Sequence, residues 1–186
     1  MVKGLTSYQL NFIALITRRD DDLMIGGPEP LTAEHLLDGF DSGVASLDEW
    51  LRRRALQNQV SRASRTFVAC DARTAVAYYT LAASAVAPNI TPGRFRRNMP
   101  DPIPVVLLAR LAICRAHQAQ GLGRALFQDA AKRVIHAADT IGIRGVLVHA
   151  ISEEAKSFYL RLGMVPSPLE PMTLMTTVAD LKAASS

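Results

Sequence analysis

The segment from Arg115 to Arg124 has the composition of an anion-binding turn. It reads R-A-H-Q-A-Q-G-L-G-R and lies between an apolar stretch and a segment with apolar residues at helical spacing. The first amide groups of a helix have no partner inside the helix and carry partial positive charge, so they can bind a phosphate. Gly121 and Gly123 would let a phosphate approach the backbone without an intervening side chain. A turn that binds no ligand is the alternative, because two glycines alone are a weak signal.

Two established phosphate-binding motifs do not match. A Walker A loop requires G-x-x-x-x-G-K-[S/T], which the chain lacks. A dinucleotide fingerprint requires a third glycine where this chain has Leu126, and no acidic residue follows in the required context. The ligand of the turn is therefore open on the residues alone.

Apolar patterns predict the elements that position this turn. Ile103 to Ile113 is rich in branched aliphatic residues and predicts a central strand. Apolar residues from Phe127 to Ala138 recur at helical spacing and predict a helix that opens at Gly121 and ends by Gly142. A final helix is expected after Ser152, which can cap it.

The remaining elements complete an α/β, or α+β, sandwich with one mixed central sheet flanked by helices. We expect a strand remnant near residues 23–25 and a short helix from Thr32 to Gly39. A second helix follows the capping box Ser46–Glu49. Strands are expected at residues 66–70, 74–86, 145–150 and 172–178.

Length and composition indicate one soluble domain. The chain has 186 residues, of which 49% are hydrophobic and 20% charged. It has two cysteines, too few for a disulfide scaffold and typical of the cytoplasm, and no apolar run reaches the ~18 residues of a membrane span. No signal peptide is recognisable. We predict a cytoplasmic protein with an N-terminal extension over residues 1–23 and a single domain over residues 24–180.

Arginines are concentrated in one part of the chain. Between Leu51 and Arg97 there are nine arginines and one acidic residue, Asp71, although the net charge of the whole chain is only +4. Guanidinium groups suit bidentate contact with phosphate, so a polyanionic partner is one interpretation. A solvated helix face is the other.

No metal site is predicted. His35, His136 and His149 are dispersed in the sequence and form no recognisable ligand set with Cys70 and Cys114. His117 is expected at the surface beside the turn. Cys114 is expected to be a buried thiol rather than a nucleophile, since no base is near it in sequence.

The spacing Gln118-x-x-Gly121-x-Gly123 directly after a strand resembles the pyrophosphate loop of GNAT-type N-acetyltransferases. The strand end Leu111–Ile113 and the segment Ser152–Met164 resemble other parts of that fold, with Met164 where an aromatic residue is usual. The resemblance implies acetyl-CoA as cofactor and a GNAT-type acyl-CoA N-acyltransferase fold. The implied cofactor-binding residues are Leu111, Ala112, Ile113, Gln118, Ala119, Gln120, Gly121, Leu122, Gly123, Arg124, Ser152, Ala155 and Phe158.

A narrower resemblance covers most of the chain from Pro28 to Val178. The segments Phe40–Gly43, Leu47–Leu51, Ala77–Leu81 and Pro166–Met175 are similar to those of the acetyltransferase toxins of bacterial toxin–antitoxin modules. This implies acetylation of the α-amino group of aminoacyl-tRNA, a block of translation, a ribbon-helix-helix antitoxin and a homodimer. The arginines then become candidates for contact with the tRNA backbone: Arg52, Arg53, Arg54, Arg94, Arg96, Arg97 and, as a lesser candidate, Arg110.

Acetyl transfer to an amine needs a proton for the departing thiolate. The resemblance makes Tyr159 the candidate donor, whereas its spacing alone is that of a core aromatic. No carboxylate is an obvious base, but an α-amino group has a pKa near ~8 and an adjacent ester lowers it further. Two alternatives stay open: an acetyltransferase for a small amine or a protein N-terminus, and a non-catalytic module that binds nucleic acid or antitoxin.

Overall fold

A computed structural model describes residues 25–185 of the chain. The predicted extension over residues 1–23 and most of the predicted strand remnant lie outside the described residues. The helices are α2 (Ala45–Trp50), a π-helical turn (Leu51–Ala55), α3 (Leu56–Ser61), α4 (Gly93–Arg96), α5 (Leu122–Ala138), α6 (Glu153–Arg161) and α7 (Val178–Ala184), with 3-10 turns at Pro88–Ile90 and Arg115–His117. No helix within residues 25–185 is both long and apolar enough to cross a membrane.

The strands form one mixed sheet, as the sequence predicts, and the sheet has seven strands. They are β1 (Glu29–Pro30), β2 (Arg65–Asp71), β3 (Thr74–Val86), β4 (Ile103–Ile113), β5 (Gly145–His149), β6 (Val165–Pro166) and β7 (Thr173–Thr177), in the order β1-β2-β3-β4-β5-β7-β6. β4 pairs with β5 in parallel, and β7 pairs antiparallel with both β5 and β6. β4 has the predicted bounds and a central position, because a strand covered on both faces carries a nearly continuous apolar run.

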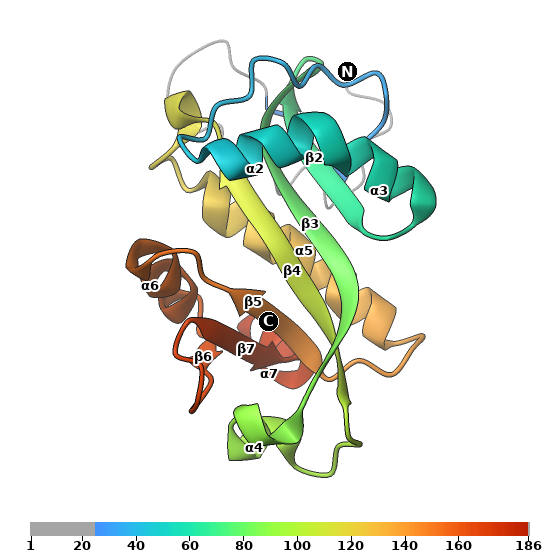
Figure 1. The fold of residues 1–186 in the computed structure, drawn as a ribbon, viewed down its shortest axis with the longest axis vertical. Helices are drawn as coiled ribbons and strands as arrows, with labels where there is room; N and C mark the ends of the chain where they lie inside the picture. Colours follow the sequence, from blue (N-terminus) through green and yellow to red (C-terminus); the bar gives the residue numbers. More distant parts are fainter. Residues whose placement is uncertain (1–24, 186) are drawn as a thin grey trace. The chain divides into compact units, whose positions relative to one another are not determined.

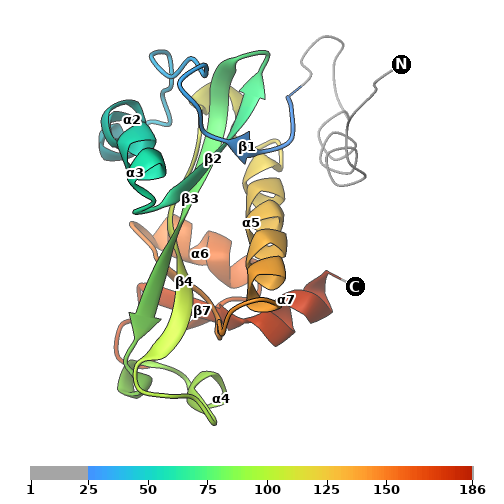
Figure 2. The ribbon, with the colours of Figure 1, turned by 90° about the vertical axis from the view of Figure 1, so that its right-hand side faces the viewer.

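The chain divides into two compact units. The first contains the described residues up to Thr80 together with Arg110–Asp129, and the second contains Leu81–Ala109 and the residues from Ala130 onward. In the first unit, α2 and α3 cover one face of β2 and β3, and the beginning of α5 lies on the opposite face (Figures 1 and 2). The anion-binding turn predicted from the sequence belongs to this unit.

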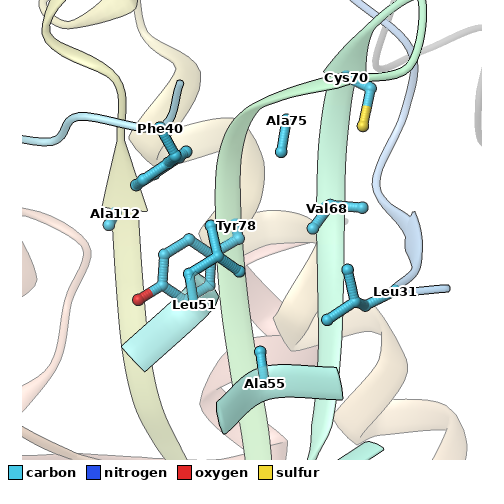
Figure 3. Packing of buried hydrophobic residues seen from close by; sticks show 9 residues of the cluster. All are labelled: Leu31, Phe40, Leu51, Ala55, Val68, Cys70, Ala75, Tyr78 and Ala112. Carbon is cyan, nitrogen blue, oxygen red and sulfur yellow. The ribbon is translucent and has the colours of Figure 1, made fainter. Parts of the chain in front are cut away.

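The core of the first unit lies between α2, the π-helical turn and the strands. Tyr78 is fully buried there, packs edge-on against Phe40 at 5.4 Å between ring centroids, and donates a hydrogen bond to the carbonyl of Leu47 at 2.8 Å. Figure 3 shows the other buried side chains of the same hydrophobic cluster. They are Leu31, Phe40, Leu51, Ala55, Val68, Cys70, Ala75 and Ala112. This packing fixes α2 on the end of β4 that leads into the turn.

In the second unit, β5 and β7 approach each other so closely that Gly145 has no room for a side chain. A Cβ atom there would lie 2.0 Å from the carbonyl oxygen of Thr176. Next to it, Arg144 donates to the carbonyls of Phe95 (2.7 Å) and Arg94 (2.6 Å), which holds the α4 segment in place. The arginine-rich loop before β4 is therefore anchored by Arg144, whose role no local sequence pattern indicates.

Two predictions about the N-terminal part are wrong. Residues 32–39 form turns instead of a helix, because the main chain of Leu36 bonds to both Arg73 and Ala75 and is thereby held beside β3. The second helix exists, but it begins at Ala45 without a side-chain cap, so Ser46 lies inside the helix. Four short elements were not predicted from the sequence: β1, α4, β6 and α7, all of which have seven residues or fewer.

Candidate functional site

The turn between β4 and α5 has a backbone that few residues adopt. After the 3-10 turn Arg115–His117, Gln118 is extended, Ala119 has φ +60° and Gly121 has φ +84°. Gly121 tolerates this left-handed conformation because it has no Cβ, whereas Ala119 adopts it at a cost in strain. The chain reverses here and enters α5 at Leu122.

The turn exposes a row of unused hydrogen-bond donors. Within residues 25–185, no amide from Ala119 to Arg124 donates to a protein acceptor, and the first bond of the new helix runs from the amide of Ala125 to the carbonyl of Gly121 at 3.2 Å. α5 is 17 residues long, so the dipole of a full helix adds to these donors. A Cβ atom added at Gly121 would have no neighbouring atom within 4 Å, so the space beside the backbone is open. This arrangement fits a diphosphate.

The side chain of Gln118 faces the protein. Its Nε2 donates to the carbonyls of Ser42 and Ile113, both at 2.9 Å. Gln118 thereby joins the end of β4 to the segment that precedes α2. Gln118 stays a predicted cofactor-binding residue, and the backbone amides from Ala119 onward are the donors that bond to no protein group.

The segment Asp41–Gly43 contacts the same turn a second time. Arg115 forms an ion pair with the carboxylate of Asp41, and the amide of Arg115 donates to the carbonyl of Asp41 at 2.9 Å. This ion pair, together with a hydrogen bond from the amide of Gly43, lowers the pKa of Asp41 below its ordinary value. The sequence alone could not indicate the pair, since its members are 74 positions apart.

The end of β4 is partly covered. Ala112 is buried in the core of the first unit, and Leu111 and Ile113 are half-buried. Cys114 donates its amide to the carbonyl of Val76 at 2.8 Å, and burial raises the pKa of its thiol. A raised pKa disfavours the thiolate, so Cys114 is not prepared to act as a nucleophile.

The candidate proton donor lies in the second unit. Tyr159 on α6 is buried, packs edge-on against Phe158 at 5.1 Å between ring centroids, and burial raises its pKa to about 12. Its helix begins as predicted, since the hydroxyl of Ser152 accepts from the amide of Ala155 at 3.2 Å. Ser152, Ala155 and Phe158 are half-buried residues of this same helix and its cap.

Four of the predicted tRNA-binding arginines have partners inside the protein. Arg52 donates to the carbonyl of Phe40 at 2.8 Å, Arg53 pairs with Glu49, and Arg94 pairs with Asp180. Arg110 is half-buried with its guanidinium 3.9 Å above the centre of the Trp50 ring, and burial lowers its pKa. The side chains of Arg54, Arg96 and Arg97 are exposed and bond to no other group in the described part of the chain. Arg52, Arg53, Arg54 and Arg110 belong to the first unit, and Arg94, Arg96 and Arg97 to the second.

The fold brings one histidine and one cysteine together, although the two residues are far apart in the sequence. The ligand atoms of Glu29, His35 and Cys70 lie within 4.8 Å of one another. However, Nδ1 of His35 accepts the amide of Thr32 at 3.0 Å, so the ring proton sits on Nε2 and faces Glu29 at 3.0 Å. A metal on Nε2 would require the opposite tautomer. The cluster therefore has the geometry of a hydrogen-bonded contact.

Comparison with known proteins assigns the family. A tRNA-acetylating toxin of Mycobacterium tuberculosis is 49% identical over 144 residues, which are 77% of this chain and 87% of the relative. The structure of AtaT complexed with acetyl-methionyl-tRNAfMet has a TM-score of 0.80 at 30% identity and covers 89% of this chain and 100% of that one. A mutant AtaT bound to acetyl-CoA and the C-terminus of the antitoxin AtaR has a TM-score of 0.73 at 31% identity, covering 88% and 97%. No protein-family model matches the chain.

The chain has a mixed sheet with an anion-binding turn after its central strand, and its fold matches these solved structures. These features define a GNAT acetyltransferase. Within that class, the chain belongs to the family of tRNA-acetylating toxins.

Proposed function

We propose that this protein transfers an acetyl group from acetyl-CoA to the α-amino group of aminoacyl-tRNA and thereby blocks translation. The observation that carries this proposal is the row of free amides from Ala119 to Arg124 at the start of α5, in a chain 49% identical to a tRNA-acetylating toxin. A charged tRNA acetylated on its amino group has no free amine with which to accept a peptide, so elongation from it stops.

The coenzyme would bind through the backbone of the first unit. Amides from Ala119 to Arg124 can donate to the diphosphate, and Gly121 leaves the space that a side chain would fill. The backbone of Leu111–Ile113 would line the pantetheine arm, with an amide near Ile113 polarising the thioester carbonyl. Ser152, Ala155 and Phe158 on the α6 side are the further candidate contacts.

The reaction forms a C–N bond and breaks the C–S bond of the thioester. The neutral amine attacks the thioester carbonyl, the thiolate of coenzyme A departs, and Tyr159 gives that thiolate its phenolic proton. The proton lost by the amine passes to solvent, from which Tyr159 is reprotonated. Tyr159 holds its proton at neutral pH, since burial raises its pKa to about 12.

The acceptor would be recognised through phosphates. Arg54, Arg96 and Arg97 are the best candidates, since their guanidinium groups are exposed and bond to no other group within residues 25–185. The paired Arg52, Arg53, Arg94 and Arg110 are weaker candidates. A ribbon-helix-helix antitoxin, a homodimer and a cytoplasmic location are further parts of the proposal, as is a single domain over residues 24–180.

A direct assay tests the function. The protein is incubated with acetyl-CoA and a mixture of charged tRNAs, and the aminoacyl ends are analysed by mass spectrometry. We expect a gain of one acetyl group on charged tRNA and none on uncharged tRNA or on formylmethionyl-tRNA, whose amine is blocked. No gain on any charged tRNA would overturn the proposal. Turnover of a small amine or a protein N-terminus that survives high salt would favour the alternative acetyltransferase.

A further inference from the structure

We infer that the segment Asp41–Gly43 is a brace that holds the acetyl-CoA turn in its binding conformation, with Arg115 and Gln118 as its points of attachment. This inference rests on the proposed function, since it names the part of the chain that prepares the coenzyme site. Asp41, Arg115 and Gln118 are positioning residues in this view. They act on the coenzyme through the backbone that follows them.

The brace holds the turn at two points. At the first, the amide of Arg115 donates to the carbonyl of Asp41 at 2.9 Å and its Nε donates to the carboxylate at 3.1 Å. At the second, Nε2 of Gln118 donates to the carbonyl of Ser42 at 2.9 Å. Arg115 and Gln118 stand at the two ends of the short turn that leads into the free amides. Both ends are therefore fixed to the same three-residue segment.

The brace is itself anchored to α2. Asp48, buried on that helix, accepts from the amide of Ser42 at 3.0 Å and from its hydroxyl at 2.5 Å. Gly43 has φ +85°, and a Cβ there would lie 3.4 Å from the side chain of Arg115. Arg52 adds a bond to the carbonyl of Phe40 at 2.8 Å. The brace is thus tied to the core of the first unit through the buried residues Ser42 and Asp48.

The turn needs such support because few interactions within the turn stabilise its conformation. Ala119 is held in the left-handed region, which is unfavourable for a residue with a side chain. The amides from Ala119 to Arg124 form no bonds that would stabilise their positions. A site whose donors are fixed before binding avoids the entropy cost of ordering them when the ligand arrives. An exposed ion pair contributes little alone, so the bonds of Gln118 and of the main chain carry most of this effect.

The main test replaces Gln118 with Met, which has similar size and no donor. We expect the Kd for acetyl-CoA, measured by calorimetry, to rise about tenfold, because Gln118 loses its bond to Ser42 in the brace and its bond to Ile113 on β4. The rate at saturating acetyl-CoA should stay within about twofold of wild type. An unchanged Kd with a normal melting temperature would overturn the inference.

A double-mutant cycle separates bracing from direct contact by Arg115. Asp41→Asn and Arg115→Gln should each weaken acetyl-CoA binding, and the double variant should be no weaker than the poorer single variant. Fully additive effects would mean that Arg115 contacts the coenzyme directly, which contradicts the brace. Asp139→Asn is the matched control, since it removes an equally exposed ion pair, with Lys182, in the second unit and should leave the Kd unchanged.

The outcomes also distinguish the two proposals. If the wild-type protein binds acetyl-CoA and the Gln118→Met variant binds equally well, only the brace is overturned. If the wild-type protein does not bind acetyl-CoA, the proposed function fails and the brace fails with it.

Discussion

At the residue scale, Tyr159 illustrates how burial sets chemical function. Taking a phenol out of water disfavours the phenolate, which raises its pKa to about 12. A proton donor with this pKa is never depleted at physiological pH. The pH dependence of turnover should therefore come from the substrate amine, with activity rising as that amine loses its proton and no decline from Tyr159 below about pH 11.

Replacing Tyr159 with Phe removes the proton and preserves the packing. We expect kcat to fall by about 10²- to 10⁴-fold, the usual contribution of a positioned acid, with no change in the Kd for acetyl-CoA. Steady-state turnover and calorimetry check the two halves of this prediction. A variant that keeps its full kcat would remove Tyr159 from the mechanism and favour the non-catalytic binding module.

Gly121 provides a second residue-scale prediction. Its φ of +84° is unfavourable for alanine, although the space around it is open. Gly121→Ala should therefore fold, but it should bind acetyl-CoA about tenfold more weakly, because the strain of about 1–2 kcal/mol and the added methyl group both oppose the bound conformation. Equal affinity would mean that the coenzyme does not approach the backbone at this point.

The residues of the candidate functional site could be predicted only in part from the sequence. The glycines and the row of amides follow from local spacing, since a turn between a strand and a helix is a local structure. The brace joins Arg115 to Asp41 and Gln118 to Ser42 across more than 70 positions, so no local pattern could reveal it. The same holds for His35 and Cys70, which tertiary structure brings together.

At the element scale, long and strongly patterned segments were predicted well. β3, β4 and α5 have clear apolar patterns and appear nearly where expected. The helix expected from Thr32 was wrong because bonds from Leu36 to the β2–β3 turn and to β3 override local propensity. β1, α4, β6 and α7 were missed because two to seven residues carry too little periodicity to be recognised.

The arginine-bearing elements allow a graded prediction. Arg54→Gln, Arg96→Gln and Arg97→Gln should each weaken tRNA binding and reduce its salt dependence by about one unit of slope, because each removes one free phosphate contact. Arg53→Gln and Arg94→Gln should have smaller effects, since these cations are already paired. Filter binding over a range of salt concentrations measures both quantities. Equal effects from the paired and unpaired groups would contradict the assignment.

At the scale of the whole molecule, stability should fall at alkaline pH. Burial raises the pKa of Cys70 to about 11 and that of Tyr159 to about 12, so the folded protein holds protons that the unfolded chain releases near pH 9 and 10. The stabilisation is complete below pH 9 and is lost as the pH rises through the folded values. For Tyr159 the loss is of the order of 2 kcal/mol.

Urea unfolding at pH 8, 9.5 and 11 tests this dependence. The free energy of unfolding should decrease in that order, and Tyr159→Phe should reduce the decrease above pH 10, because phenylalanine does not titrate. A free energy that stays constant to pH 11 would show that neither group retains its proton in the folded state.

The contact at Gly145 has an evolutionary consequence. A toxin harms the cell that makes it, so cells that inactivate it by mutation gain an advantage. Any replacement at this position forces a side chain into the carbonyl of Thr176 and separates β5 from β7. We therefore expect clones that survive expression of the toxin to carry replacements at Gly145 more often than replacements at exposed positions.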